Sequence, residues 1–165
     1  MALDMFLELK GVKGETRDDK FKGKGGVDIL AWSFGVTNSG SAHVGGGIGS
    51  GKANFQDISI TKYIDLSSAS LMQSVSVGTH FDEAKITVRK SGGKNAQLDY
   101  YTIELKEVMV TSYQTGGSGG EDRLTESLTL TFAKVNVKYQ AQSEKGAAAG
   151  DTKFGYDIAA NKAVA

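Results

Sequence analysis

The chain has 165 residues, enough for about one domain, so we expect residues 1–165 to form a single domain with a substantial core. Its 19 basic and 19 acidic side chains give a formal net charge of zero, which argues against nucleic acid or an anionic membrane surface as a partner. The chain contains no cysteine, which excludes disulfides, a thiol nucleophile and cysteine-ligated metals.

The first ten residues do not have the form of a signal peptide, because they lack a basic start and carry acidic residues among the apolar ones. No apolar run approaches the roughly 20 residues that a membrane-spanning helix needs. We therefore expect a protein made in the cytoplasm, without membrane insertion.

Residues 27–36 alternate between bulky and small side chains, a pattern typical of a β-strand. The bulky face consists of Leu30, Trp32 and Phe34, which we expect to fill a core. Ala31 and Ser33 then point to the opposite face.

Residues 46–53 read Gly-Gly-Ile-Gly-Ser-Gly-Lys-Ala and approach the glycine-rich loop that binds phosphates in nucleotide hydrolases. A working loop needs a Ser or Thr hydroxyl after the lysine and a helix directly behind it. Here Ala53 replaces the hydroxyl, and residues 54–65 are rich in β-branched and aromatic side chains that favour a strand. The segment 38–52 is therefore predicted to be a long flexible loop, without a nucleotide cofactor.

One helix is predicted, over residues 67–77. Ser70 and Gln73 have the spacing of a capping box, Leu71 and Val75 share a face, and Gly78 lies where a left-handed cap would end the helix. Residues 82–90 alternate again and predict a strand with one solvated face.

Two long alternating runs, 98–113 and 124–139, are joined by the glycine-rich residues 114–122 and predict a long hairpin. The second run changes parity: its apolar side chains are first Leu124, Leu128, Leu130 and Phe132, and then Val135, Val137 and Tyr139. A change of parity requires a bulge or a strand that moves from one layer to another, and both close sheets into barrels.

Residues 146–150 are predicted to be a small-residue linker before a last short strand at 154–158. The fold expected from all these elements is mainly β: an antiparallel β-barrel of two packed sheets, with one short flanking α-helix and an extended glycine-rich loop. Leu128, Leu130 and Phe132 are expected in its core.

Catalytic and metal-binding patterns are weak. His43 and His80 lie near turns without a second ligand at metal spacing. Residues 116–120 match Gly-x-Ser-x-Gly, but no histidine follows to complete a triad. The acidic pairs 18–19 and 121–122 lie in charged, glycine-flanked segments where solvated carboxylates are expected. The sequence predicts no enzyme, no cofactor and no metal site.

Several segments together resemble the haemolysin-coregulated proteins, the tube subunits of type VI secretion systems. The resemblance is carried by the order and spacing of pieces across nearly the whole chain: residues 4–7, 11–16, 27–35, 55–65, 115–126 and 132–135. It implies a β-barrel subunit of a hexameric ring, rings that stack into a hollow tube, and a tube expelled by a contractile sheath together with spike proteins. It also implies small effector proteins carried in the lumen and secretion without a cleaved signal peptide.

Within such a ring we expect the small side chains of Ala31, Ser33, Thr129 and Thr131 to line the lumen. The glycine-rich loop is expected to touch the next ring through Gly45, Gly46, Gly47, Ile48, Gly49, Ser50, Gly51 and Lys52. Two alternatives stay open: a phage-type tail tube protein, and a sugar-binding β-sandwich. An enzymatic variant would need an appended toxin domain, for which residues 157–165 leave no room.

Overall fold

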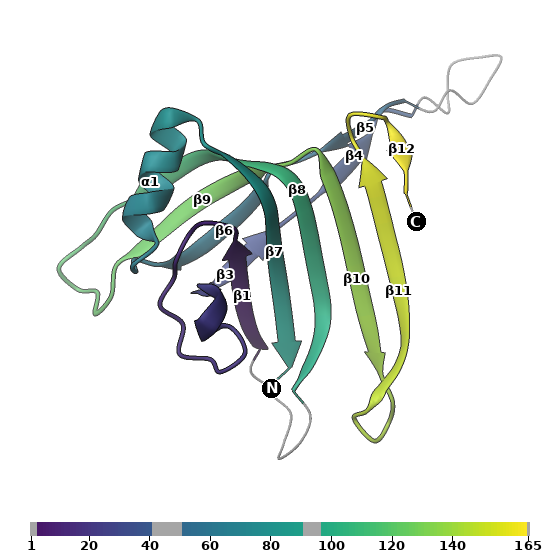
Figure 1. Ribbon diagram of the computed structural model, residues 1–165, viewed down its shortest axis with the longest axis horizontal. Coiled ribbons are helices and arrows are strands. Elements are labelled where there is room, and N and C mark those ends of the chain that lie inside the picture. Colours follow the sequence, from purple (N-terminus) through teal and green to yellow (C-terminus); the bar gives the residue numbers. More distant parts are fainter. Residues whose placement is uncertain (1–2, 41–50, 91–96, 165) are drawn as a thin grey trace.

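The computed structural model describes residues 3–40, 51–90 and 97–164 and shows a strongly curved β structure with one α-helix at its end (Figure 1). Its elements follow in the order β1 (Leu3–Leu9), a 3-10 turn (Lys22–Lys24), β2 (Val27–Asp28), β3 (Ala31–Ser33), β4 (Val36–Asn38), β5 (Ala53–Phe55), β6 (Ile58–Tyr63), α1 (Ser68–Val77), β7 (His80–Lys90), β8 (Leu98–Thr115), β9 (Thr125–Thr131), β10 (Lys134–Gln142), β11 (Ala148–Asp157) and β12 (Lys162–Ala163). The expectation of a mainly β fold with one short helix is confirmed.

Strand β8 organises the main sheet, because it pairs with three other strands. β7 lies along one edge, while β10 and then β9 lie along the other. The path β12-β11-β10-β8-β7-β1-β2 makes one layer, and β9-β6-β3 continues into a second. β2 pairs with β1 and β3 pairs with β6, so residues 27–33 bridge the two layers without closing one continuous ladder.

The predicted change of parity occurs where β9 gives way to β10. Lys106 pairs with Lys134 and Met109 with Thr131, so both strands of the long hairpin are interrupted at the same level. Glu107 has φ 55° there, in the left-handed region. The buried face of β8 accordingly shifts from Leu105 to Val108, and the strand passes from one layer to the other.

The core lies between the two layers and includes Leu128, Leu130 and Phe132, with Leu71 of α1 closing one end. Trp32 and Phe34 pack against it but remain partly exposed. Leu30, expected in the core, is 41% exposed, whereas its neighbour Ile29 is buried.

The change of partner between β2 and β3 explains the misplaced leucine. The Ile29 amide donates to Met5 on β1, whereas the next amide, from Leu30, donates to Thr61 on β6. Strict alternation over residues 27–36 is therefore broken at this point, and the prediction that assumed it was wrong for Leu30.

Helix α1 begins one residue later than predicted and has no capping box. Its N-cap is Ser67, without a side-chain cap hydrogen bond, so Ser70 lies inside the helix. The side chain of Asp65 accepts a hydrogen bond from the Ser67 amide at 2.9 Å and replaces the expected cap. Gly78 adopts φ 67° and donates to Ser74, as predicted for the C-terminal cap.

The C-terminal part is more regular than predicted. β11 extends over ten residues and pairs with β10, so the last strand is longer than the segment 154–158 expected from the sequence. Residues 143–147 form the turn between them, with Gly146 at φ 80°. The expected linker at 146–150 is thus partly turn and partly strand.

Candidate functional site

Strands β4 and β5, which flank the glycine-rich loop in the sequence, pair as a two-stranded ladder, and we call this ladder together with the loop the arm. The amide side chain of Asn38 donates to the Gly51 carbonyl at 2.8 Å, and a Cβ at Gly51 would lie 2.3 Å from the Ser39 hydroxyl. Of the predicted contact loop, Gly51 and Lys52 lie directly before β5, while residues 45–50 lie outside the described residues. A strand follows Lys52, so no helix N-terminus is available there for a phosphate.

The four side chains expected to line a lumen lie on one face of the second layer. Ser33 pairs with Ser59 across β3 and β6, and Ser59 pairs with Thr129 across β6 and β9. The alternation that buries Leu128 and Leu130 turns Thr129 and Thr131 outward. The small outward side chains of these strands are Ala31, Ser33, Ser59, Thr61, Ser127, Thr129 and Thr131, and we call them the hydroxyl face. At the end of β6, Tyr63 and its register partner Thr125 have the same outward parity.

Hydrogen bonds from neighbouring residues of β8 fix the Thr129 hydroxyl of this face. The Thr129 hydroxyl lies 2.6 Å from the Thr111 hydroxyl and 2.7 Å from that of Ser112. Thr111 also donates to Asp57 at 2.7 Å. The register shift on β8 between Val110 and Ser112 makes the double contact with Thr129 possible, because two successive β8 residues oppose one on β9.

A buried ionic cluster lies on the core side of the same strands. Lys62 and Glu126 are register partners on β6 and β9, they form an ion pair, and both are almost fully buried. Lys62 also donates to Asp65 at 2.9 Å, and Ser68 of α1 donates to Glu126 at 2.9 Å. The cluster therefore ties the start of α1 to the sheet.

Tyr113 on β8 completes this cluster by donating to Glu126. Burial, followed by the hydrogen bond to Glu126, raises the pKa of Tyr113 to about 12. Sequence patterns did not indicate this cluster, although Lys62 and Glu126 stand among apolar residues at core parity on their strands, which is the signal that could have found them.

A second ionic group lies under the loop of residues 11–26. The guanidinium of Arg89 lies 5.0 Å from the centre of the Phe6 ring and 5.6 Å from that of Phe21, and it pairs with Asp18. The hydrogen bond from Arg89 lowers the pKa of Asp18. This group explains why the acidic pair 18–19 is partly structural: Asp18 holds the loop on the sheet.

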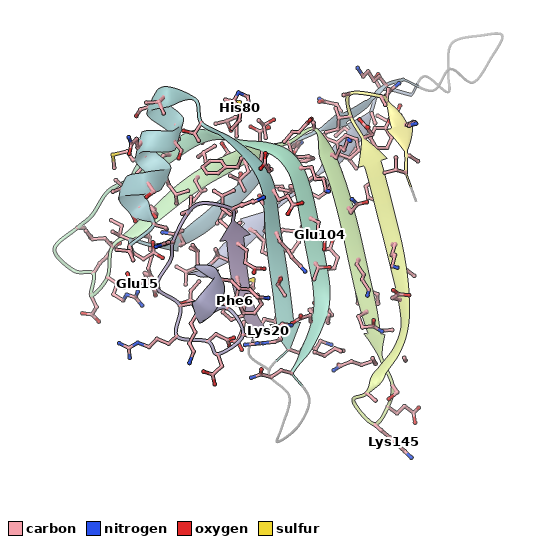
Figure 2. The ribbon with its side chains drawn as sticks, in the orientation of Figure 1. Phe6, Glu15, Lys20, His80, Glu104 and Lys145 are labelled. Atoms are coloured by element: carbon pink, nitrogen blue, oxygen red, sulfur yellow. The ribbon has the colours of Figure 1, made fainter. Side chains whose placement is uncertain are left out.

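The other residues that the sequence offered as catalytic or metal-binding candidates do not come together in the described part of the structure. His80 lies exposed at the start of β7 (Figure 2), and His43 falls outside the described residues. Within residues 3–40, 51–90 and 97–164, no group of three or more His, Asp or Glu side chains could hold a metal ion. The only α-helix in those ranges is too short to span a membrane.

Comparisons with known proteins give one consistent result. A family model described as "Type VI secretion system effector, Hcp" matches residues 6–139. Protein hcp1 of Pseudomonas aeruginosa is 53% identical over 162 residues, which cover 98% of each chain.

Solved structures agree with this result. A structure described as that of a type six secretion system protein matches with a TM-score of 0.91 at 28% identity, covering 99% of this chain and 100% of that one. Hcp1 from Salmonella typhimurium matches with a TM-score of 0.80 at 29% identity, with 99% and 100% covered.

Proposed function

This chain belongs to the Hcp family of type VI secretion proteins, and we propose that it forms hexameric rings that stack into a hollow tube. A contractile sheath expels this tube, and the lumen carries small effector proteins. In each proposed subunit, residues 1–165 make one β-barrel domain. Its partners are further copies of itself, the sheath and spike proteins, and the effectors.

The hydroxyl face is the observation that best supports a carrier role. Ser33, Ser59 and Thr129 make a row across three strands, and their side chains are small and carry no charge. A lumen of this chemistry offers weak hydrogen bonds to many cargo surfaces and no strong ionic attachment. Cargo would therefore be retained without being fixed.

We propose that the chain is a structural, secreted protein and not an enzyme, which its membership of the Hcp family supports. We propose that the subunit assembles in the cytoplasm and leaves the cell as part of the tube, without a cleaved signal peptide.

Ring closure requires a heterologous contact, in which each copy presents two different surfaces.

Native mass measurement and negative-stain images of the purified protein test the assembly. We expect a mass of six subunits and rings with a central hole. A stable monomer would refute the ring and favour the sugar-binding alternative. Rings obtained from a gene within a virion cluster would favour the phage-type tail tube.

Substitution of Ser33 by Gln tests the carrier role. The longer amide side chain would reduce the space in the lumen next to the hydroxyl face without adding charge. We therefore expect intact rings but lower recovery of co-expressed effector. Pull-down of the effector with the ring measures this, and Ser143→Gln, in the turn before β11, is the matched control. Equal effector recovery in both variants would remove the hydroxyl face from the lumen.

A further inference from the structure

A pocket with side chains of both charges lies at the end of β6. Its volume is about 520 Å³, and its walls come from the loop of residues 11–26, from β2 and the segment after it, from the end of β6 and from the β8–β9 loop. Tyr63, the last residue of β6, lines the pocket and has the same outward parity as Ser59 and Thr61 of the hydroxyl face. The pocket therefore adjoins that face. Its residue Glu15 lies on the side of the molecule away from the β10–β11 hairpin (Figure 2).

Three carboxylates line the pocket, and each of them already accepts a hydrogen bond within the fold. Glu15 accepts from the Leu66 amide at 3.0 Å. Asp28 accepts from the Thr16 hydroxyl at 2.7 Å. The third, Asp65, belongs to the buried ionic cluster described above. These contacts hold the loop of residues 11–26 against β2 and the segment before α1, so the carboxylates have a structural role.

The two arginines of the pocket are used differently. Among the described residues, neither Arg17 nor Arg123 has an ion-pair partner or a side-chain hydrogen bond. The guanidinium of Arg123 lies over the Tyr63 ring, 3.9 Å from its centre. This contact uses the flat face of the guanidinium and leaves the N–H groups along its edge for a carboxylate. Tyr63 therefore orients Arg123 without using its hydrogen-bonding groups.

An apolar side chain completes the pocket. Leu30, which alternation would have placed in the core, lines the pocket and is 41% exposed. Together with Tyr63 it offers an apolar surface to the methylene groups of a ligand. A pocket that combines such a surface with oriented guanidinium groups suits an acidic side chain of a peptide.

The balance of charge distinguishes between an acidic peptide and a simple anion. Asp65 is paired with Lys62 at 2.9 Å, and the other two carboxylates balance the two arginines. An inorganic anion would meet the arginines and the carboxylates together and gain little attraction. A peptide segment with Asp or Glu brings a carboxylate for the arginines and amide N–H groups for the carboxylates.

We propose that this pocket binds an Asp or Glu side chain of a carried effector protein. The inference rests on the proposed function, which places the hydroxyl face in the lumen, and deepens it by naming the chemistry that selects the cargo. The hydroxyl face carries no charge and does not discriminate between cargo proteins by charge. At its end, Arg123 and Arg17 pair with the cargo carboxylate, while Glu15 and Asp28 accept amide N–H groups of the same segment.

Binding of short fluorescent peptides to the purified chain tests the pocket directly. The three probes are peptides of alternating Gly and Glu, Gly and Gln, or Gly and Lys, and fluorescence anisotropy gives their dissociation constants. We expect the Glu peptide to bind about fivefold or more tightly than the Gln peptide, and added salt to reduce the difference. Equal binding of the Glu and Gln peptides, or tightest binding of the Lys peptide, would overturn the proposal.

Two substitutions on separate segments identify the residues responsible. Arg123→Gln and Arg17→Gln should each weaken binding of the Glu peptide about fivefold and leave the Gln peptide unchanged. Both arginines are exposed, so the thermal midpoint should stay the same. Lys145→Gln is the matched control, because it removes one positive charge at the tip of the β10–β11 hairpin, far from Glu15 (Figure 2). An equal loss in this control would reduce the effect to net charge and overturn the pocket.

Competition with inorganic phosphate separates a peptide site from a simple anion site. At matched ionic strength, phosphate should displace the Glu peptide no better than chloride does. Stronger displacement by phosphate would overturn the assignment to an acidic peptide.

The outcomes separate this inference from the proposed function. The pocket lies within one subunit, so the peptides can be tested whether or not rings form, and a monomeric native mass would refute the ring alone. In rings, recovery of co-expressed effector should fall in Arg123→Gln as well as in Ser33→Gln. Recovery that falls only in Ser33→Gln would overturn the pocket and leave the carrier role intact.

Discussion

Lys62 occupies a core position that alternation along β6 would assign to an apolar side chain, as at Ile58 and Ile60. It is kept there by Glu126, its register partner on β9, and by Asp65. A buried ion pair adds little stability over an apolar pair, but removal of one partner leaves an uncompensated charge. The cluster therefore sets the register of β6 against β9.

Substitution of Lys62 by Met is expected to lower the free energy of unfolding by about 3–5 kcal/mol, because Glu126 stays buried without its cation. The matched control is Lys138→Met, which removes an ion pair to Asp151 of 3.4 Å with both side chains well exposed. Its loss should be at most about 1 kcal/mol. Guanidinium unfolding at one protein concentration measures both, and equal losses would contradict the structural role of Lys62.

The raised pKa of Tyr113 predicts a loss of stability in alkali. The ordinary pKa of a tyrosine is 10.0, whereas the pKa of Tyr113 in the fold is about 12, so the folded protein holds this proton more tightly. The stabilisation is complete below pH 10 and is lost as the pH rises toward 12. We expect the unfolding midpoint of Tyr113→Phe to fall less steeply over this range than that of the unsubstituted chain. Parallel curves would contradict the assignment.

At the scale of elements, the long hairpin could be predicted from the sequence, whereas the role of residues 27–33 could not. Alternation over 98–139 predicted both strands of the hairpin and the change of parity, because parity is a local property of a chain buried on one side. It could not predict the bridging role of residues 27–33, since a strand that changes partners depends on two distant edges, those of β1 and β6.

Deletion of residues 45–51 tests the arm. In the sequence, this segment lies between β4 and β5, which pair with each other and not with the main sheet. We therefore expect rings to form normally, while tubes become shorter or disappear. Negative-stain tube lengths measure the effect, and deletion of residues 116–119 in the β8–β9 loop is the control. Tubes of full length from the variant that lacks residues 45–51 would refute the stacking role.

For the whole molecule, the order of the sequence motifs indicated the family, although the sequence offered no convincing catalytic pattern. The family resemblance drawn from motif order is confirmed by the match over residues 6–139 and by the relative at 53% identity. Ala31, Ser33, Thr129 and Thr131 could be placed on outward faces because their apolar neighbours alternate with them.

The buried ionic cluster could not be found in this way. The cluster joins β6, β8, β9 and α1, and its contacts connect residues up to 64 positions apart in the sequence. The exposure of Tyr139 and Phe154, which share a face of the β10–β11 hairpin with the buried Val135, is likewise seen only in the three-dimensional arrangement.

The position of β8 between β7, β9 and β10 has a consequence for folding. None of the strands made before it can complete the sheet, because β7 needs β8 directly, and β6 needs β9, which itself pairs with β8. A nascent chain that ends before residue 98 therefore carries unpaired strand edges in solution. Productive folding is a late event dominated by long-range pairing, and it is slow relative to that of helical proteins of the same length.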